Sequence, residues 1–456
     1  MIRIIPIVIC LCACTRLTAQ PADTIVQKLD AYLSAAHLAG RFNGNALVAR
    51  EGQILLQKSY GYRNVAEHLS NDSTTIFQIG SVTKQFTAAV ILELQEEGKL
   101  SVTDRLDRYF PQYRYARDIT IENLLTHSSG LYDYTSDIDA SDSAQACRPV
   151  SQQVVLDIIF KHKLSFRPGT QMQYCNSGYY LLGLIIEKVT GKSYEQNIHD
   201  RVFTPLQMNH SLFDFNPSAD RKIATGYQTL NDTIQKVASA WRWDSTVTFA
   251  AGGIWSTTGD LYRWMLAMRD HEILTPGSWR EMMQRRLDHY GYGLYIDSLY
   301  GTPEIYHGGG IPGFSANLCY YPEKDVMIIL LSNVGWFDQS LDPVNTDLSA
   351  ILFHFPYELM RNTTGTQFPD SVLHRYVGRY DFDRKHHAYV TLENHQLMIE
   401  APQGGLPRSP LFAEDDKNFY LKIINARIEF IKGSDGTITG LISHYRGKQE
   451  TCIKVR

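Results

Sequence analysis

The sequence predicts an α+β or α/β core with a helical middle, followed by a small β-barrel or β-sandwich. Strand-like segments lie near both ends of the first 362 residues and apolar helical segments lie between them, so one sheet must be assembled from distant parts of the chain. Beyond about residue 370 the chain contains short strand-like runs separated by turns, as small all-β domains do. With 456 residues, 44% of them hydrophobic, the chain is long enough for more than one domain.

The elements of the first domain follow from local periodicity. Two strands joined by a turn around Glu51 and Gly52 are expected at residues 45–49 and 54–58. A strongly apolar helical run begins after Ser81 and ends near Gly98. The pattern also predicts helices at 156–160 and 179–189, and strands at 292–296, 317–321 and 326–331.

A polar, turn-rich linker at residues 361–370 separates the two expected domains, which we assign to residues 20–362 and 363–456. The strand-like runs of the second domain are residues 376–380, 388–392, 396–399, 419–421, 428–431 and 437–444.

The first 19 residues have the pattern of a secretory signal peptide. Arg3 precedes an apolar stretch from Ile4 to Cys14, which is too short to span a bilayer as a helix. Small residues then mark a cleavage site after Ala19, so we expect an exported protein, periplasmic or extracellular. The alternative is a lipoprotein box at residues 11–14 that would anchor the protein to the membrane through Cys14. A retained membrane-spanning anchor is disfavoured by the length of the stretch.

Composition argues against several other classes of function. The net charge is −4 and no long basic run occurs, so nucleic acid is not an expected partner. The four cysteines beyond the leader are scattered without a CxxC pair, and His386-His387 is an isolated pair. We therefore predict neither a metal site nor a cofactor.

Three short motifs carry the chemistry. The first is Ser81-Val82-Thr83-Lys84. Its hydroxyl lies at a helix N-terminus, where free N–H groups stabilise negative charge, and its amine lies one turn further on. Each residue also has an ordinary interpretation, because serine is a common helix cap and a lysine can extend to solvent.

The second motif is Tyr174-Cys175-Asn176, whose phenol and amide point to the same side if the segment is extended. The third is His307-Gly308-Gly309-Gly310. Glycines within a strand often mark the close approach of a ligand, and the strand edge at Gly309 and Gly310 could offer N–H and C=O groups to an extended substrate. Alone, these motifs could be a turn and a glycine-rich loop. The G-x-S-x-G elbow of α/β-hydrolases is absent.

Together the three motifs resemble those of serine β-lactamases and penicillin-binding proteins, in the branch that includes class C β-lactamases and D-alanyl-D-alanine carboxypeptidases. The stretches 124–131, 166–169 and 252–257 are also similar to that family, and the resemblance covers about residues 40–350. It implies an α/β sandwich with an antiparallel sheet plus a helical region. The tail resembles a small β-barrel often appended to these enzymes.

The resemblance also implies a role for each motif residue. Ser81 would be the nucleophile, Lys84 and Tyr174 would share general-base and general-acid work, and Asn176 would orient the acyl side of the substrate. Which of Lys84 and Tyr174 takes the serine proton stays open. The backbone N–H groups of Ser81 and Gly310 would form the oxyanion hole. His307 stands where many relatives have lysine, and it could bind a substrate carboxylate only as a cation.

The expected function is therefore that of an exported serine hydrolase acting through a Ser81 acyl-enzyme, preferably on D-amino-acid peptides or related amides, including cell-wall peptides. The alternatives are an esterase or β-lactamase with the same residues, or a non-catalytic binding protein of the same fold. The stretch 132–147 is either a loop at the rim of the cleft or a solvated insertion. The sequence does not fix the oligomeric state.

Overall fold

The computed structural model describes residues 22–138, 146–213, 221–230, 233–236, 242–335, 340–361, 365–404, 406–445 and 448–455. The expected cleavage after Ala19 and the alternative lipidation at Cys14 lie outside these residues. No helix within the described ranges is long and apolar enough to cross a membrane.

The centre of the first domain is a six-stranded antiparallel sheet in the order β10-β11-β12-β13-β1-β2. Its early strands are β1 (Gly44–Arg50) and β2 (Gln53–Tyr60). Its late strands are β10 (Tyr295–Leu299), β11 (Thr302–Ile311), β12 (Phe314–Tyr321) and β13 (Val326–Ser332). Because β1 pairs with β13 from Gly44 to Arg50, the sheet joins distant segments as the sequence predicts.

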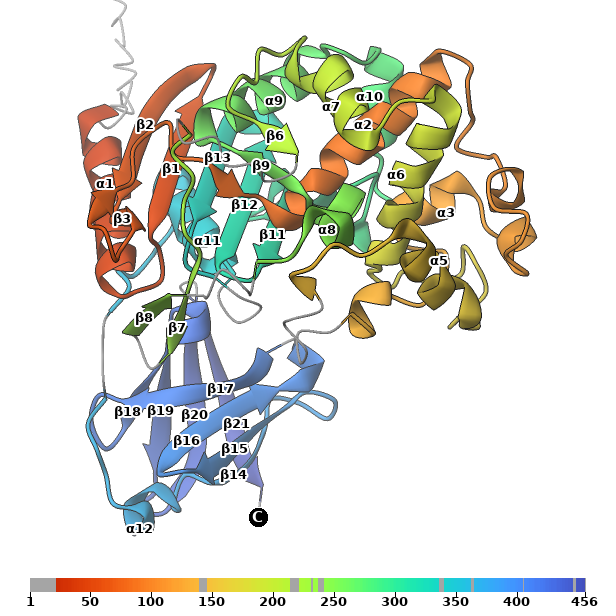
Figure 1. Cartoon of the computed structure of the whole chain (residues 1–456). Coiled ribbons are helices and arrows are strands. Elements are labelled where there is room, and N and C mark those ends of the chain that lie inside the picture. Colours follow the sequence, from red (N-terminus) through yellow and green to blue (C-terminus); the bar gives the residue numbers. More distant parts are fainter. Residues whose placement is uncertain are drawn as a thin grey trace, which may run out of the picture.

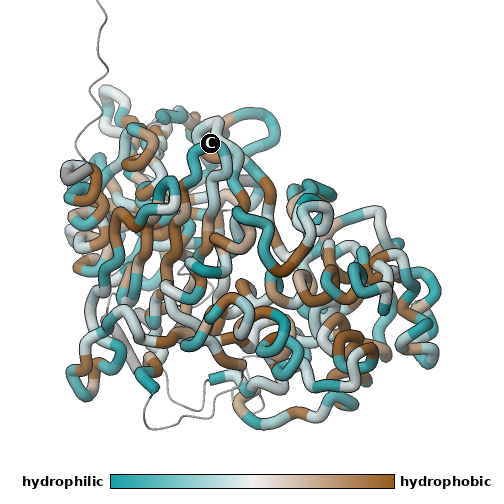
Figure 2. The backbone as a smooth tube through the Cα atoms, turned by 90° about the horizontal axis from the view of Figure 1, so that it is seen from above, coloured by the Kyte–Doolittle hydropathy of each residue, from teal (hydrophilic) through white to brown (hydrophobic). Residues whose placement is uncertain are grey.

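Helices cover both faces of this sheet (Figure 1). On one face, α1 (Ala22–Leu38) and α11 (Asp342–Phe353) pack against side chains of β1 and β13. On the other face, α2 (Thr83–Glu96) and α9 (Thr258–Asp270) belong to the larger core. Hydrophobic stretches run through these layers, whereas many of the peripheral loops are hydrophilic (Figure 2).

A helical region flanks the sheet and surrounds α2. It contains α3 (Ile121–Leu125), α5 (Gln152–Lys161), α6 (Asn176–Thr190), α7 (Tyr194–Ile198), α8 (Ser245–Gly252) and α10 (Pro276–Met282). The predicted helices at 156–160 and 179–189 lie within α5 and α6. Short strands complete the domain: β3 (Tyr62–Asn64), β4 (Leu69–Ser70), β5 (Phe77–Gln78), β6 (Leu212–Phe213), β7 (Tyr227–Leu230), β8 (Thr233–Lys236) and β9 (Ile254–Ser256).

The second domain is a closed eight-stranded antiparallel barrel, which lies below the first domain in Figure 1. Short helix α12 (Asp370–Leu373) precedes it. Its strands are β14 (Gly378–Asp381), β15 (His387–Glu393), β16 (Gln396–Ala401), β17 (Leu406–Ala413), β18 (Asn418–Leu421), β19 (Ala426–Lys432), β20 (Ile438–Tyr445) and β21 (Lys448–Val455). The six predicted runs coincide with or overlap six of these strands. Strands β17 and β21 were not predicted, because β17 contains two prolines and β21 is largely polar and exposed.

One asparagine ties the barrel to the first domain. Asn425, at the turn between β18 and β19, donates from Nδ2 to Asp347 Oδ2 at 2.8 Å and to the Glu358 carbonyl at 3.0 Å. Its own Oδ1 accepts from the Tyr420 hydroxyl at 2.5 Å. Asp347, on α11, also accepts from the buried Tyr32 hydroxyl at 2.7 Å. The amide of Asn425 therefore contributes two hydrogen bonds to a polar network between the barrel and the first domain.

We predict that Asn425→Asp lowers the melting temperature by a few degrees, because it replaces the donor to Asp347 with a second carboxylate. The cost should be roughly 1–2 kcal/mol, because a partly buried hydrogen bond is lost and two carboxylates are brought together. Asn394→Asp is the matched control, because Asn394 is also a left-handed turn asparagine (φ 45°) of the barrel but is exposed. Thermal unfolding followed by circular dichroism tests this. Equal melting temperatures for the two variants would contradict it.

Candidate active site

Ser81 is held in a 3-10 turn, Gly80–Val82, directly before α2. Gly80 has φ +50°, a left-handed conformation that glycine adopts without strain. The turn lies against β11 at Gly309, where an added Cβ would come within 2.0 Å of the Ile79 carbonyl oxygen and 3.3 Å of Ser81 N. The first and third motifs are therefore in backbone contact, and only glycine fits at position 309.

Lys84 lies behind the serine, with no exposed surface. Its Nζ donates to Ser81 Oγ at 3.0 Å, to Asn176 Oδ1 at 2.9 Å and to the Ala251 carbonyl at 2.8 Å. Helix α8 is interrupted at Phe249 (φ 37°), near the carbonyl that Lys84 uses. Burial lowers the pKa of Lys84 to about 7, against a smaller opposing effect of Asp133. The amine therefore changes charge near neutral pH.

Tyr174 forms one wall of this amine site. Its ring centroid lies 4.8 Å from Lys84 Nζ, and the Tyr179 ring lies 5.6 Å from the same atom. The Tyr174 hydroxyl oxygen is buried and has no hydrogen bond of normal geometry among the described residues. Burial raises its pKa well above 10, although its proximity to Ser81 acts in the opposite direction. The phenol therefore stays protonated and is available as a proton donor.

Asn176 begins α6 directly after the extended residue Cys175. Its backbone N–H and its side-chain Nδ2 both donate to Asp133 Oδ2, at 2.9 and 3.1 Å. Asp133 lies in the stretch that the sequence suggested as a cleft rim, and it lines the cleft. Sequence reasoning had no basis for selecting Asp133, because no local spacing relates it to Asn176.

His307 lies on β11 but is not a cation. It is 2% exposed, its Nδ1 donates to the Gly308 carbonyl at 2.6 Å and its Nε2 accepts from the Tyr290 hydroxyl at 2.9 Å. Burial, together with the charge of Lys84, lowers the pKa of His307 to about 3. The hypothesis that His307 binds a carboxylate as a cation near neutral pH is thus disfavoured.

A second histidine, His127, supports the Tyr174-Cys175-Asn176 segment. The backbone N–H of Cys175 donates to His127 Nδ1 at 3.1 Å, and the His127 ring packs 4.2 Å from the Tyr174 ring. Burial keeps the pKa of His127 well below its usual value. His127 lies in the stretch 124–131 that resembles the family, but its sequence position did not indicate this contact.

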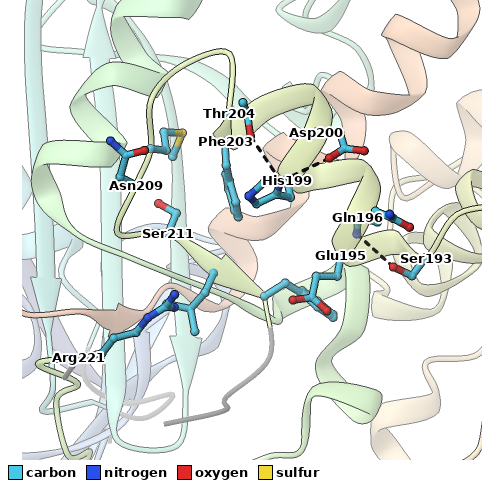
Figure 3. A pocket seen from close by; sticks show the side chains of 13 residues that line it. Ser193, Glu195, Gln196, His199, Asp200, Phe203, Thr204, Asn209, Ser211 and Arg221 are labelled. Carbon is cyan, nitrogen blue, oxygen red and sulfur yellow. Dashed lines mark hydrogen bonds and ion pairs between the residues drawn. The ribbon is translucent and has the colours of Figure 1, made fainter. Parts of the chain in front are cut away.

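Ser81, Tyr174 and Asn176 line a cleft of about 290 Å³, whereas Lys84 and the two histidines do not line it. Its described lining includes Ser81, Tyr174, Asn176, Asp133 and Gly310, together with Tyr134, Thr135, Trp243, Thr248, Ile311 and Pro312. A larger cavity of about 870 Å³ lies elsewhere, between α7 and β6 (Figure 3). The described lining of that cavity contains none of the motif residues, so the chemistry belongs to the smaller cleft.

We predict that Gly309→Ala lowers kcat/KM about 10²-fold or more, because the new methyl group would displace β11 from the turn that carries Ser81. Gly308→Ala is the control: its Cβ would meet its nearest atoms at an ordinary 3.8 Å. Steady-state kinetics of both variants test this. Similar activities for the two would show that the close approach is unimportant.

The chain is similar to known proteins over both of its domains. Residues 23–346 match the Beta-lactamase family model, and residues 364–452 match a domain of unknown function, DUF3471. Penicillin-binding protein 4* of Bacillus subtilis (strain 168) is 30% identical over 443 residues, covering 91% of this chain and 96% of that protein. The teichoic acid D-alanine hydrolase of Staphylococcus aureus (strain MRSA252) is 27% identical, covering 69% and 75%.

Solved structures give the same fold. D-amino acid amidase from Ochrobactrum anthropi SV3, complexed with L-phenylalanine amide, superposes with a TM-score of 0.64 at 25% identity, covering 73% of this chain and 98% of that one. The octameric penicillin-binding protein homologue from Pyrococcus abyssi has a TM-score of 0.66 at 23% identity, covering 94% and 100%. The latter likeness extends over nearly the whole chain.

Proposed function

The chain belongs to the β-lactamase family of serine hydrolases, and we propose that it is exported and cleaves D-amino-acid peptides or related amides through an acyl-enzyme on Ser81. The observation that carries this proposal is the buried amine of Lys84, held 3.0 Å from Ser81 Oγ. Export rests on the N-terminal sequence alone.

The contacts of Lys84 favour it as the base that activates Ser81. A lysine amine has three hydrogens when charged and two hydrogens with a lone pair when neutral. Lys84 Nζ has three hydrogen-bonding directions, and two of them face the carbonyl acceptors Asn176 Oδ1 and Ala251 O. These two acceptors bind N–H hydrogens whether the amine is charged or neutral. In neutral Lys84 the lone pair is therefore directed at the third partner, the Ser81 hydroxyl. The pKa of about 7 makes this neutral form accessible at physiological pH.

The reaction then proceeds in two steps. Ser81 Oγ attacks the substrate carbonyl and its proton passes to Lys84, while the N–H groups of Ser81 and Gly310 stabilise the oxyanion. The C–N bond breaks as the leaving nitrogen takes the proton of Tyr174, and Lys84 returns a proton to the phenol. Water then attacks the carbonyl of the acyl-enzyme while the same groups transfer protons in the reverse order. This step releases the carboxylic acid and restores Ser81.

The lining of the cleft favours amides without a carboxylate beside the scissile bond. No described residue that lines the cleft carries a permanent positive charge, and His307 behind it is neutral. A β-lactam or a peptide ending in D-alanine carries a carboxylate next to the scissile bond. Among the described residues that line the cleft, no cation is present to pair with that carboxylate. The relative that is a D-amino acid amidase supports this choice. The teichoic acid D-alanine hydrolase supports a second candidate, release of D-alanyl groups from a wall polymer.

A substrate panel tests the proposal directly. The mature protein and Ser81→Ala are incubated with D-alanine amide, its L-enantiomer, D-alanyl-D-alanine and a penicillin, with product formation and intact mass followed in parallel. Turnover of the D-amide that requires Ser81 and exceeds turnover of the penicillin is expected. Preferential penicillin hydrolysis would identify a β-lactamase, and preference for the L-amide would overturn the stereochemical assignment.

We predict that kcat/KM rises with pH through about 7 and levels off above it. Lys84 must be neutral to accept the serine proton, and its pKa is lowered to about 7, so protonation inactivates the free enzyme on the acid side. Activity should be measured from about pH 5 to 9 for wild type and His307→Gln. Because His307 is neutral throughout, the variant should keep the same midpoint. Activity that falls with rising pH in this range would contradict the assignment of Lys84 as base.

A further inference from the structure

We infer that Asp133 is a positioning residue that fixes the orientation of the Asn176 amide and thereby aims Lys84 at Ser81. This inference rests on the proposed function, because it concerns the same site. It assigns a role to a carboxylate that belongs to none of the three motifs.

Four hydrogen bonds hold the Asp133 carboxylate in place. Its Oδ1 accepts from the Thr135 backbone N–H at 3.0 Å and from the Thr135 hydroxyl at 2.8 Å. The first of these bonds caps the 3-10 turn Tyr134–Ser136. Its Oδ2 accepts from Asn176 N at 2.9 Å and from Asn176 Nδ2 at 3.1 Å. Each carboxylate oxygen thus has two donors, and these donors come from two separate elements, the turn and α6.

This carboxylate decides which end of the Asn176 amide faces Lys84. An asparagine side chain has an NH₂ end and an oxygen end of nearly equal size. With Nδ2 bound to Asp133, Oδ1 lies 2.9 Å from Lys84 Nζ. A flipped amide would place oxygen against the carboxylate and NH₂ against the lysine amine. The first contact would be repulsive. The second would oppose donor to donor when Lys84 is charged, and would occupy its lone pair when it is neutral, so Asp133 selects the orientation that leaves the third position of Lys84 facing Ser81.

Asp133 also supplies negative charge near Lys84. The other titratable groups around the amine are Cys175, Tyr174, Tyr179, His127 and His307, all neutral near pH 7. Asp133 raises the pKa of Lys84 against the larger lowering by burial. Removing the charge should therefore move the acid limb of the activity profile to lower pH.

The test is the pH dependence of kcat/KM for Asp133→Asn, with Asp137→Asn as the matched control. Asp137 lies in the same segment, but it binds Lys161 at 2.6 Å and the Tyr132 hydroxyl outside the described cleft lining. For Asp133→Asn we expect a plateau about 10–100-fold lower and an acid limb displaced to lower pH. Asp137→Asn should match wild type in both. An Asp133→Asn profile that superimposes on wild type would overturn the inference.

A double-mutant cycle separates positioning from general destabilisation. If Asp133 acts through the Asn176 amide, the loss of plateau rate in Asp133→Asn should largely disappear in an Asn176→Ala background. Fully additive losses would overturn the inference. Thermal unfolding of each variant checks that it is folded.

The kinetics use p-nitrophenyl acetate as well as D-alanine amide. If wild type turns over only the ester, the proposed amide substrate is wrong, but the role of Asp133 is still tested on Ser81.

Discussion

The burial of one amine organises this site. Lys84 has no exposed surface, so its donors need acceptors inside the protein, where an unpaired charge would be very costly. The acceptors come from the turn before α2, the start of α6 and the broken helix α8. Satisfying a single lysine thus requires three elements, far apart in sequence, to meet at one point. The same loss of solvent makes the lysine a base near neutral pH.

The buried surroundings that lower the pKa of Lys84 also determine the charge of His307 in the third motif. The rings of Tyr174, Tyr179 and Tyr290 pack around the amine and the two histidines, and they exclude water from all of them. Because burial and the neighbouring lysine lower the pKa of His307 to about 3, its imidazole does not take up the second proton that would make it a cation near neutral pH. His307 therefore serves as a neutral acceptor for Tyr290, and a permanent cation is absent from the described cleft lining.

Sequence reasoning selected residues that stand in short motifs, and the structure brings them together: Ser81, Lys84, Tyr174, Asn176 and the glycines after His307. It also anticipated the sheet built from distant segments. Asp133, His127 and the Ala251 carbonyl join the site only through tertiary contacts, so no local pattern marks them. The charge of His307 could not be predicted from sequence, because it depends on how deeply the folded protein buries the imidazole. Strands β17 and β21 were missed because prolines and exposed polar residues hide the alternation that identifies a strand.

The place of β1 in the sheet has a consequence for biogenesis. This strand emerges early from the ribosome, yet it lies between β2 and β13, and β13 ends at Ser332. Such long-range pairing delays folding until most of the domain has been synthesised. Gly309, which packs against the serine turn, is also a late residue. The nascent polypeptide therefore carries no assembled nucleophile, and if the protein is secreted unfolded, its hydrolytic activity would arise only after translocation.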